Sequence, residues 1–402
     1  MNVLFIAPFD LRIRDGTTVR VINLVRAVAQ VCDTVFLASY TNNEYLKALS
    51  NIVHIRLKNI QLRYHLAMAF TSSILTRLAS KFLTRFFEIG FEYNKNIYES
   101  IDIIHVHWLL FSYLAKYIQT LSPRWIPLIV DLHGSYRIQE PLNYSMKNIL
   151  LHTLGLLHET TTIRNSSISA FTVPSSSFGE FVKSAYGIDS RKVFVVPDVV
   201  EPEVLASAKE CNDKGAEELL GERIASRGVV AYVGTVSKYH GFFDLVEAFR
   251  IAKRSYKDLN LLLIVPSLQQ LAKLGRFLPE ETVVLENVPR RILPCVLRRA
   301  SVLVLPHRAG TQFDYLPSNK VYDYMLAGRP IVAYRTPAVE TALGDYSMRI
   351  LVEPNNPVEL AKGILKAMLL YGDSEPKPAF DKVPLLESAA NALERVYHIV
   401  TK

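Results

Sequence analysis

The sequence predicts an α/β protein built from two doubly wound parallel sheets, and two observations support this. Short apolar runs alternate with helix-like runs along the chain, an order typical of parallel strands joined by crossover helices. The alternation occurs as two separate series, and 402 residues suffice for two domains of ordinary size.

The first series predicts a Rossmann-like domain over residues 1–197. A strand over 3–9 precedes a helix over 18–30 and a strand over 34–38. Further short apolar runs, each of strand length, follow at 103–108, 128–132, 169–173 and 193–196.

The second series predicts another Rossmann-like domain over residues 198–380. Strands are expected at 229–233, 261–265, 282–285, 302–305 and 331–333, with helices at 243–254, 293–299, 319–327 and 358–370. The Pro-flanked segment 197–202 marks the junction. A last helix, near 385–400, has apolar residues at helical spacing.

Composition narrows the classes of protein and partner. Half of the residues are hydrophobic, which favours a sizeable core over disorder. The net charge of +8 suits an anionic partner: a nucleotide, a nucleic acid or an acidic membrane surface. Cys32, Cys211 and Cys295 lie far apart and predict neither a disulfide framework nor a zinc site, so a reducing compartment is expected. No apolar run approaches the ~20 residues of a membrane span, and the apolar start is too short for a signal peptide core.

The segment 315–333 carries the clearest functional pattern. Pro317 and Ser318 supply a turn and a plausible N-cap, residues 319–327 form a helix, and Gly328 ends it before a buried strand. Lys320 lies in the first helical turn. Free backbone N–H groups, the helix dipole and this amine together predict an anion site, whereas an ordinary helix–strand corner is the alternative.

This order of residues resembles the nucleotide-sugar signature of the retaining glycosyltransferase family 4, which has the GT-B fold. Asp323 stands where that family usually has Glu. The resemblance covers nearly the whole chain and implies two Rossmann-like domains facing an interdomain cleft, with a C-terminal helix, 381–402, packing back on the N-terminal domain. It implies a nucleoside diphosphate sugar as co-substrate and no cofactor. No Asp-x-Asp motif occurs, so a reaction without a metal ion is expected.

The resemblance also assigns donor-binding residues in the C-terminal domain. After the strand at 229–233 the family usually has a Gly-Arg step and a later Lys; here Thr235 replaces the Arg and His240 the Lys. Lys238 could supply the missing charge, and Lys320 and Lys238 are expected to stabilise the leaving diphosphate. Asp323 is expected to accept hydrogen bonds from ribose. The implied donor-binding residues are Gly234, Thr235, His240, Asp314, Tyr315, Ser318, Asn319 and Asp323.

In the N-terminal domain the resemblance points to the acceptor and to the reacting sugar. Asp15 and Gly16 stand in the glycine-bearing loop after the first strand, where Gly16 would let the backbone approach a phosphate. His107 ends a strand on the same face as His105. A metal site and a packed pair of histidines are the alternatives there. His133 ends the next strand and is expected to line the sugar pocket near the reacting carbon.

We therefore expect a metal-independent hexosyltransferase acting with retention on a lipid-linked or glycan hydroxyl. A sugar-nucleotide epimerase or phosphorylase of the same fold, and a catalytically weakened nucleotide-binding relative, are the alternatives. No nucleic-acid motif occurs. The basic, apolar stretch 56–85 suggests reversible association with an anionic membrane at its cytoplasmic face, although ordinary solvated helices would have the same composition.

Overall fold

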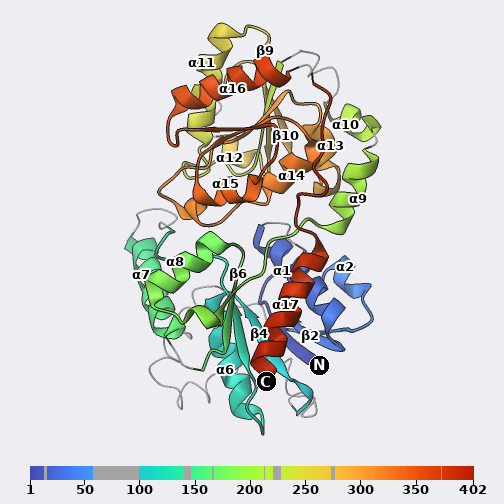
Figure 1. The fold of residues 1–402 in the computed structure, drawn as a ribbon, viewed down its shortest axis with the longest axis vertical. Helices are drawn as coiled ribbons and strands as arrows, with labels where there is room; N and C mark the ends of the chain where they lie inside the picture. Colours follow the sequence, from blue (N-terminus) through green and yellow to red (C-terminus); the bar gives the residue numbers. More distant parts are fainter. Residues whose placement is uncertain are drawn as a thin grey trace. The chain divides into compact units, whose positions relative to one another are not determined.

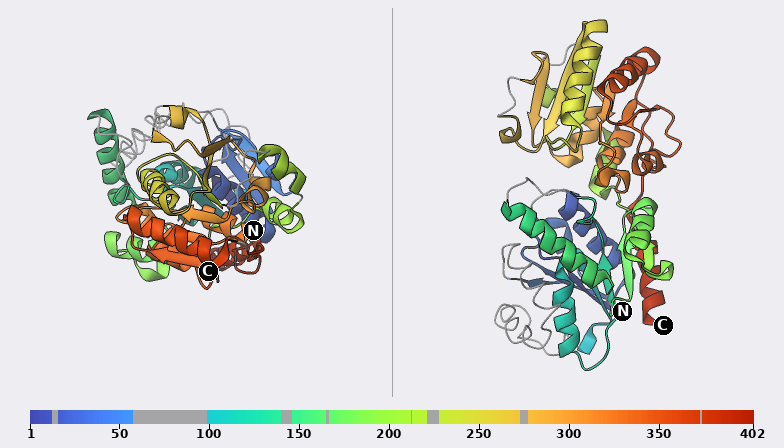
Figure 2. Two further views of the ribbon diagram at one scale, coloured as in Figure 1. Left: turned by 90° about the horizontal axis from the view of Figure 1, so that it is seen from above. Right: turned by 90° about the vertical axis from the view of Figure 1, so that its left-hand side faces the viewer.

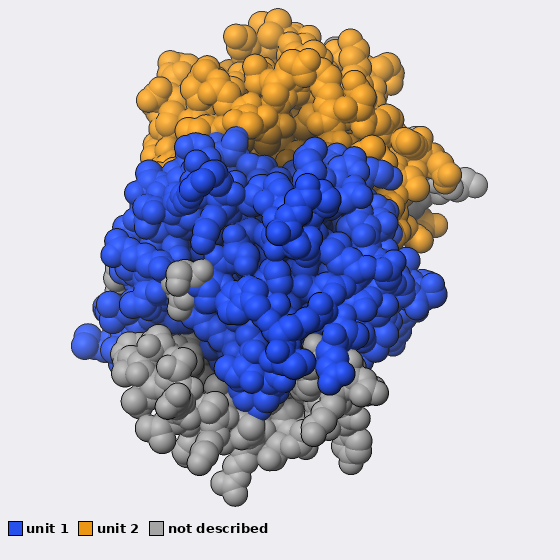
Figure 3. Space-filling model, turned by 60° about the horizontal axis from the view of Figure 1, so that its bottom comes forward, with its two compact units in different colours: residues 1–199, 386–402 blue, residues 200–385 orange. Residues whose placement is uncertain are grey.

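The computed structural model describes residues 1–12, 16–57, 99–139, 146–164, 167–211, 213–220, 228–272, 277–372 and 374–402. They form two compact units (Figure 3): unit 1 is Met1–Val199 with Leu386–Lys402, and unit 2 is Val200–Leu385. Each unit is a parallel sheet flanked by helices (Figure 1), which confirms the predicted doubly wound α/β fold.

Unit 1 is built on a seven-stranded sheet in the order β3-β2-β1-β4-β5-β6-β7. The strands are β1 Asn2–Ile6, β2 Thr34–Ser39, β3 Ile52–Arg56, β4 Ile103–His107, β5 Leu128–Asp131, β6 Ala170–Val173 and β7 Val193–Val195. The chain grows outward from β1 to β3 and then returns to place β4 on the other side of β1. In such sheets ligands bind at the carboxyl ends of the strands beside this reversal.

The helices of unit 1 cover this sheet. They are α1 Gly16–Val31, α2 Glu44–Lys47, α6 Ser112–Leu121, α7 Met146–Ile163, α8 Ser176–Tyr186 and α17 Leu386–Thr401, with short 3-10 turns η1 Leu109–Phe111 and η2 Ser190–Lys192. The first and last helices, α1 and α17, lie side by side (Figure 1). Leu393 and Tyr397 of α17 share a core with Phe5 of β1, so the C-terminal helix is part of the N-terminal unit.

Unit 2 has a six-stranded parallel sheet in the order β10-β9-β8-β11-β12-β13. The strands are β8 Gly228–Val233, β9 Leu259–Val265, β10 Thr282–Glu286, β11 Val302–Leu305, β12 Ile331–Tyr334 and β13 Arg349–Val352. The helical elements are α9 Pro202–Glu210, α10 Asp213–Leu220, α11 Phe242–Ser255, α12 Gln269–Ala272, η5 Arg290–Ile292, α13 Leu293–Leu297, η6 Gln312–Asp314, α14 Lys320–Ala327, α15 Pro337–Leu343 and α16 Pro357–Tyr371.

Both faces of the central strands β8, β11 and β12 are buried, which explains why these strands are almost entirely apolar in sequence. Val230 and Tyr232 of β8 pack with α11 and α16, which lie side by side (Figure 2). The alternate residues, Val229 and Ala231, join the opposite core with α9, α13 and α14. No helix in the described parts of the chain is long and apolar enough to cross a bilayer.

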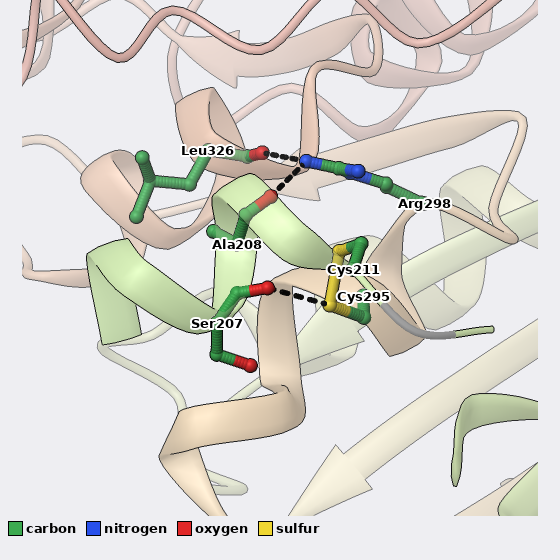
Figure 4. The surroundings of a disulfide bond; sticks show 6 residues. All are labelled: Ser207, Ala208, Cys211, Cys295, Arg298 and Leu326. Atoms are coloured by element: carbon green, nitrogen blue, oxygen red, sulfur yellow. Dashed lines mark hydrogen bonds between the residues drawn. A yellow bond between two sulfur atoms is a disulfide. The ribbon is translucent and has the colours of Figure 1, made fainter. Parts of the chain in front are cut away.

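One prediction about this unit is wrong. Cys211, which caps the end of α9, forms a disulfide with Cys295 of α13, 84 residues away (Figure 4). The Arg298 side chain ties the same two helices by donating to the carbonyl of Ala208 at 2.5 Å. The packing of α9 against α13 brings the cysteines together, and their sequence spacing gives no sign of it. Cys32 is a free thiol.

Candidate active site

The loop after β8 begins one of two polar clusters at the carboxyl ends of strands. Gly234 has a φ of 138°, and a Cβ there would collide with the Lys320 amine. Gly241 has a φ of 68°, and a Cβ there would collide with the carbonyl of Pro306. Both glycines are therefore required for close approach, the first to α14 and the second to the segment after β11. Thr235 and the exposed Lys238 lie in the turn between them.

The amine of Lys320 lies at the centre of this cluster. Its Nζ is buried, lies 5.4 Å from the centroid of the Tyr232 ring, and has no hydrogen-bond partner in the described structure. Burial lowers the pKa of Lys320 to about 7, and the nearby carboxylate of Asp323 opposes that shift. A buried amine without a partner is costly, and an anionic ligand would remove the cost.

Two histidines lie beside this amine. The His240 ring lies 5.5 Å from the His307 ring, which stacks on Phe313 at 4.0 Å. His240 Nδ1 lies 2.7 Å from Ser237 Oγ, whereas neither ring nitrogen of His307 has a partner among the described residues. His307 was not among the sequence-predicted residues, although its place two residues beyond β11, at the carboxyl end of a central strand, could have suggested it.

The two carboxylates that were predicted to bind the nucleotide sugar already accept hydrogen bonds from other groups of the protein. Asp323, only 1% exposed, accepts from Arg290 at 3.1 Å, and Arg290 also binds Glu201 at 2.6 Å. Burial raises the pKa of Asp323. The Asp314 carboxylate accepts a hydrogen bond from the backbone N–H of Gly310 at 2.8 Å, and Tyr315 is the next residue in the chain.

The start of α14 corrects the predicted cap. The helix begins at Lys320, and Asn319 occupies the cap position without a side-chain cap hydrogen bond. Ser318 lies one residue before the cap position, and its Oγ is 3.5 Å from the backbone nitrogen of Lys320. The Asn319 Oδ1 atom is buried and lacks a partner within the described structure.

The second cluster lies in unit 1, at the ends of β4 and β5. Asp131 ends β5 and accepts two hydrogen bonds from Arg20 of α1, at 2.7 and 3.0 Å. Arg20 also donates to Asp198 at 2.7 Å, and all three side chains are buried. His107 Nδ1 lies 2.8 Å from Asp131. The fixed charge of Arg20 holds the pKa of Asp131 well below its usual value despite burial.

The predicted residues of unit 1 relate to this cluster in different ways. The His133 ring lies 6.1 Å from that of His107; its Nδ1 is buried and has no partner in the described residues, and burial lowers the pKa of His133 to about 4. His105 is turned to α17, where its Nδ1 lies 2.8 Å from the Tyr397 hydroxyl. Gly16 begins α1 and is exposed, and Asp15 lies outside the described residues.

Two further features of the described residues bear on this cluster. Trp108, directly after His107, has a φ of 72°, a strained conformation for a non-glycine residue and one that is often found at functional sites. No three or more His, Cys, Asp or Glu side chains are grouped to hold a metal ion in the described ranges.

Comparison with known proteins shows which family the chain resembles. Residues 14–204 match the family described as Glycosyltransferase Family 4, and residues 227–369 match Glycosyl transferases group 1. A 2-deoxystreptamine glucosyltransferase of Streptomyces kanamyceticus is 22% identical over 250 residues, which are 60% of this chain and 62% of that relative. The match thus spans less than two thirds of the relative.

Solved structures share the fold over their whole length. A glycosyltransferase from Rickettsia africae ESF-5 superposes with a TM-score of 0.66 at 14% identity, covering 100% of this chain and 98% of that one. Anabaena Alr3699/HepE in complex with UDP-glucose superposes with a TM-score of 0.58 at 15% identity, covering 100% and 98% of the two chains. With its N-terminal and C-terminal parts matching the two family models in order, the chain belongs to the GT-B glycosyltransferases of the family 4, group 1 type.

Proposed function

We propose that this protein transfers a sugar from a nucleoside diphosphate sugar to an acceptor hydroxyl with retention of configuration. The observation that carries the proposal is the buried, unpartnered amine of Lys320 beside Gly234. Family membership and the UDP-glucose complex of the Anabaena neighbour give it further support.

The proposed mechanism is mainly electrostatic. Negative charge develops on the diphosphate as the bond to the sugar breaks, and the Lys320 amine at the start of α14 stabilises that charge. The departing phosphate then takes the acceptor proton on the same face of the sugar, so no protein nucleophile and no metal ion are needed. His133 contributes by contact with the transferred sugar.

The test is a panel of nucleotide sugars, each supplied with lipid-linked and glycan acceptors, with release of nucleoside diphosphate as the readout. We expect release with at least one donor, a loss of two or more orders of magnitude in Lys320→Met, and product NMR that shows the donor's anomeric configuration. An inverted product would leave transfer intact and overturn retention, whereas no release with any donor would contradict the activity itself.

We further propose that the acceptor is presented on an anionic membrane at the cytoplasmic face. Most of the basic stretch 56–85 lies outside the described residues, so the support comes from α7. Its exposed side chains include Met146, Ile149, Leu150 and Leu157, which recur at helical spacing. An exposed apolar stripe of this kind is typical of helices that lie in a membrane interface.

Liposome co-sedimentation tests this partner. We expect salt-sensitive binding to vesicles with anionic lipid and weaker binding of a Leu150→Ser, Leu157→Ser double variant. Leu369→Ser is the control, because Leu369 is an even more exposed leucine but lies on α16 of unit 2. Equal recovery in the supernatant with and without anionic vesicles would contradict the membrane proposal alone.

A further inference from the structure

The imidazole of His307 has an environment that calls for a ligand. It is fully buried two residues beyond the end of β11, and both ring nitrogens lack hydrogen-bond partners in the described structure. Buried polar side-chain atoms are in large majority hydrogen-bonded, so two unpartnered nitrogens on one ring indicate a missing partner.

The surroundings of His307 are basic and aromatic. Phe313 of η6 stacks on the ring at 4.0 Å, and His240 meets its edge with centroids 5.5 Å apart. The amine of Lys320 in α14 acts electrostatically on both histidines. Asp323, the carboxylate that acts electrostatically on that amine, is itself bound to Arg290. The close approach of Gly241 to Pro306 fixes the turn bearing His240 against the segment bearing His307.

Lys320, His240 and His307 disfavour one another's protonation when no anion is bound. Burial first, and then the charge of Lys320, lowers the pKa of His240 to about 3 and that of His307 well below its usual value. With the pKa of Lys320 at about 7, the amine is about half protonated near neutral pH, and both histidines are neutral. A bound polyanion would reverse this balance, because each added proton would then be paired with negative charge.

We propose that His307 binds the diphosphate of the donor together with Lys320 and His240, and that the cluster takes up protons from solvent as the diphosphate binds. This inference rests on the proposed function. If it holds, His307 is part of the diphosphate site. The affinity for the nucleotide sugar then depends on pH, because His307, His240 and Lys320 can gain or lose a proton, whereas arginine side chains would stay charged throughout.

Isothermal titration of UDP, GDP, ADP and dTDP in buffers of different ionisation enthalpy measures the proton uptake. For the nucleotide that binds, we expect uptake at about pH 8 and an affinity that falls as pH rises further. His307→Gln should lose ~10-fold in affinity at about pH 6.5 and clearly less at about pH 9, because it keeps a hydrogen-bond donor and cannot become charged. His307→Phe should lose more than His307→Gln at both pH values, and the exposed His398→Gln should match the wild type.

The outcomes separate this inference from the proposed function. Binding without proton uptake, or equal uptake and equal pH dependence in His307→Gln, would overturn the inference and leave the donor site standing. No binding of any of the four nucleotides would overturn both. If the variants fail to fold, the histidine ¹⁵N spectrum of the wild type decides: saturating nucleotide should turn a ring into its imidazolium form, and an unchanged spectrum would contradict the inference.

Discussion

The amine of Lys320 lies over the face of the Tyr232 ring, 5.4 Å from its centroid. The Tyr232 hydroxyl donates to the carbonyl of Thr235 at 2.9 Å, so the ring that supports the amine also holds the loop after β8. This cation–π contact and the nearby carboxylate of Asp323 offset only part of the cost of burying the amine, and they fall short of a direct ion pair or a set of hydrogen bonds.

Replacing Lys320 by Met should therefore stabilise the protein when it is measured without nucleotide. The pKa of this amine falls from an ordinary 10.5 to about 7 on folding, so the wild type bears the full penalty below about pH 7. The penalty shrinks as pH rises toward the unfolded-state value, because the folded amine is then neutral. Thermal melts from pH 6 to pH 10 should show the largest gain in Tm at the acid end, and a lower Tm for Lys320→Met there would contradict this account.

Gly234→Ala should abolish nucleotide binding with a small loss of stability. An alanine Cβ at this position would occupy the place of the Lys320 amine. Gly310→Ala is the matched control, because Gly310 also has a positive φ, 78°, but nothing lies within 4 Å of its added Cβ. Equal nucleotide affinities in the two variants would show that the contact between Gly234 and Lys320 is not needed for the site.

Asp131→Asn should destabilise unit 1 by about 3 kcal/mol, because it leaves Arg20 buried with one carboxylate fewer. The depressed pKa of Asp131 also means that its stabilisation, present at neutral pH, is lost as pH falls through the folded-state value. Denaturant unfolding measures the loss. Asp189→Asn, which breaks an exposed pair with Arg191, should leave the midpoint nearly unchanged.

The disulfide predicts a response to reductant. Reduction should lower the stability of unit 2 by about 2 to 4 kcal/mol, because the bond closes a loop of 84 residues in the unfolded chain. Thermal melts with and without reductant should differ for the wild type and for Cys32→Ser. The Cys295→Ser variant should have a lower Tm than the wild type, and reductant should leave that Tm unchanged. A wild-type melt that reductant leaves unchanged would show that Cys211 and Cys295 are not joined.

The sequence was sufficient for features that depend on local pattern. The six-residue apolar run of β8 and the helix of α14 with its Gly328 stop both lie within a residue or two of their predicted positions. The side-chain contacts of the two clusters and the disulfide could not be predicted from the sequence, because they join segments that are far apart in the chain. Arg20 looks like a solvated helical residue until α1 packs over the end of β5, and Cys295 gains its partner only when α13 meets α9.

The predicted site residues divide in the same way. Residues that follow strands, such as Gly234 and His133, could be placed by topology alone. The engagement of Asp323 by Arg290 could not, because Arg290 stands 33 residues earlier, in η5.

Titration of nucleoside diphosphates into the wild type and Lys320→Met, followed by thermal shift, tests the central claim most directly. The account predicts that at least one of UDP, GDP, ADP and dTDP stabilises the wild type, by about 2.7 kcal/mol at ~100 times its Kd, and that Lys320→Met loses the shift. No shift with any of the four, or a shift of equal size in Lys320→Met, would contradict the assignment of the donor diphosphate to this amine.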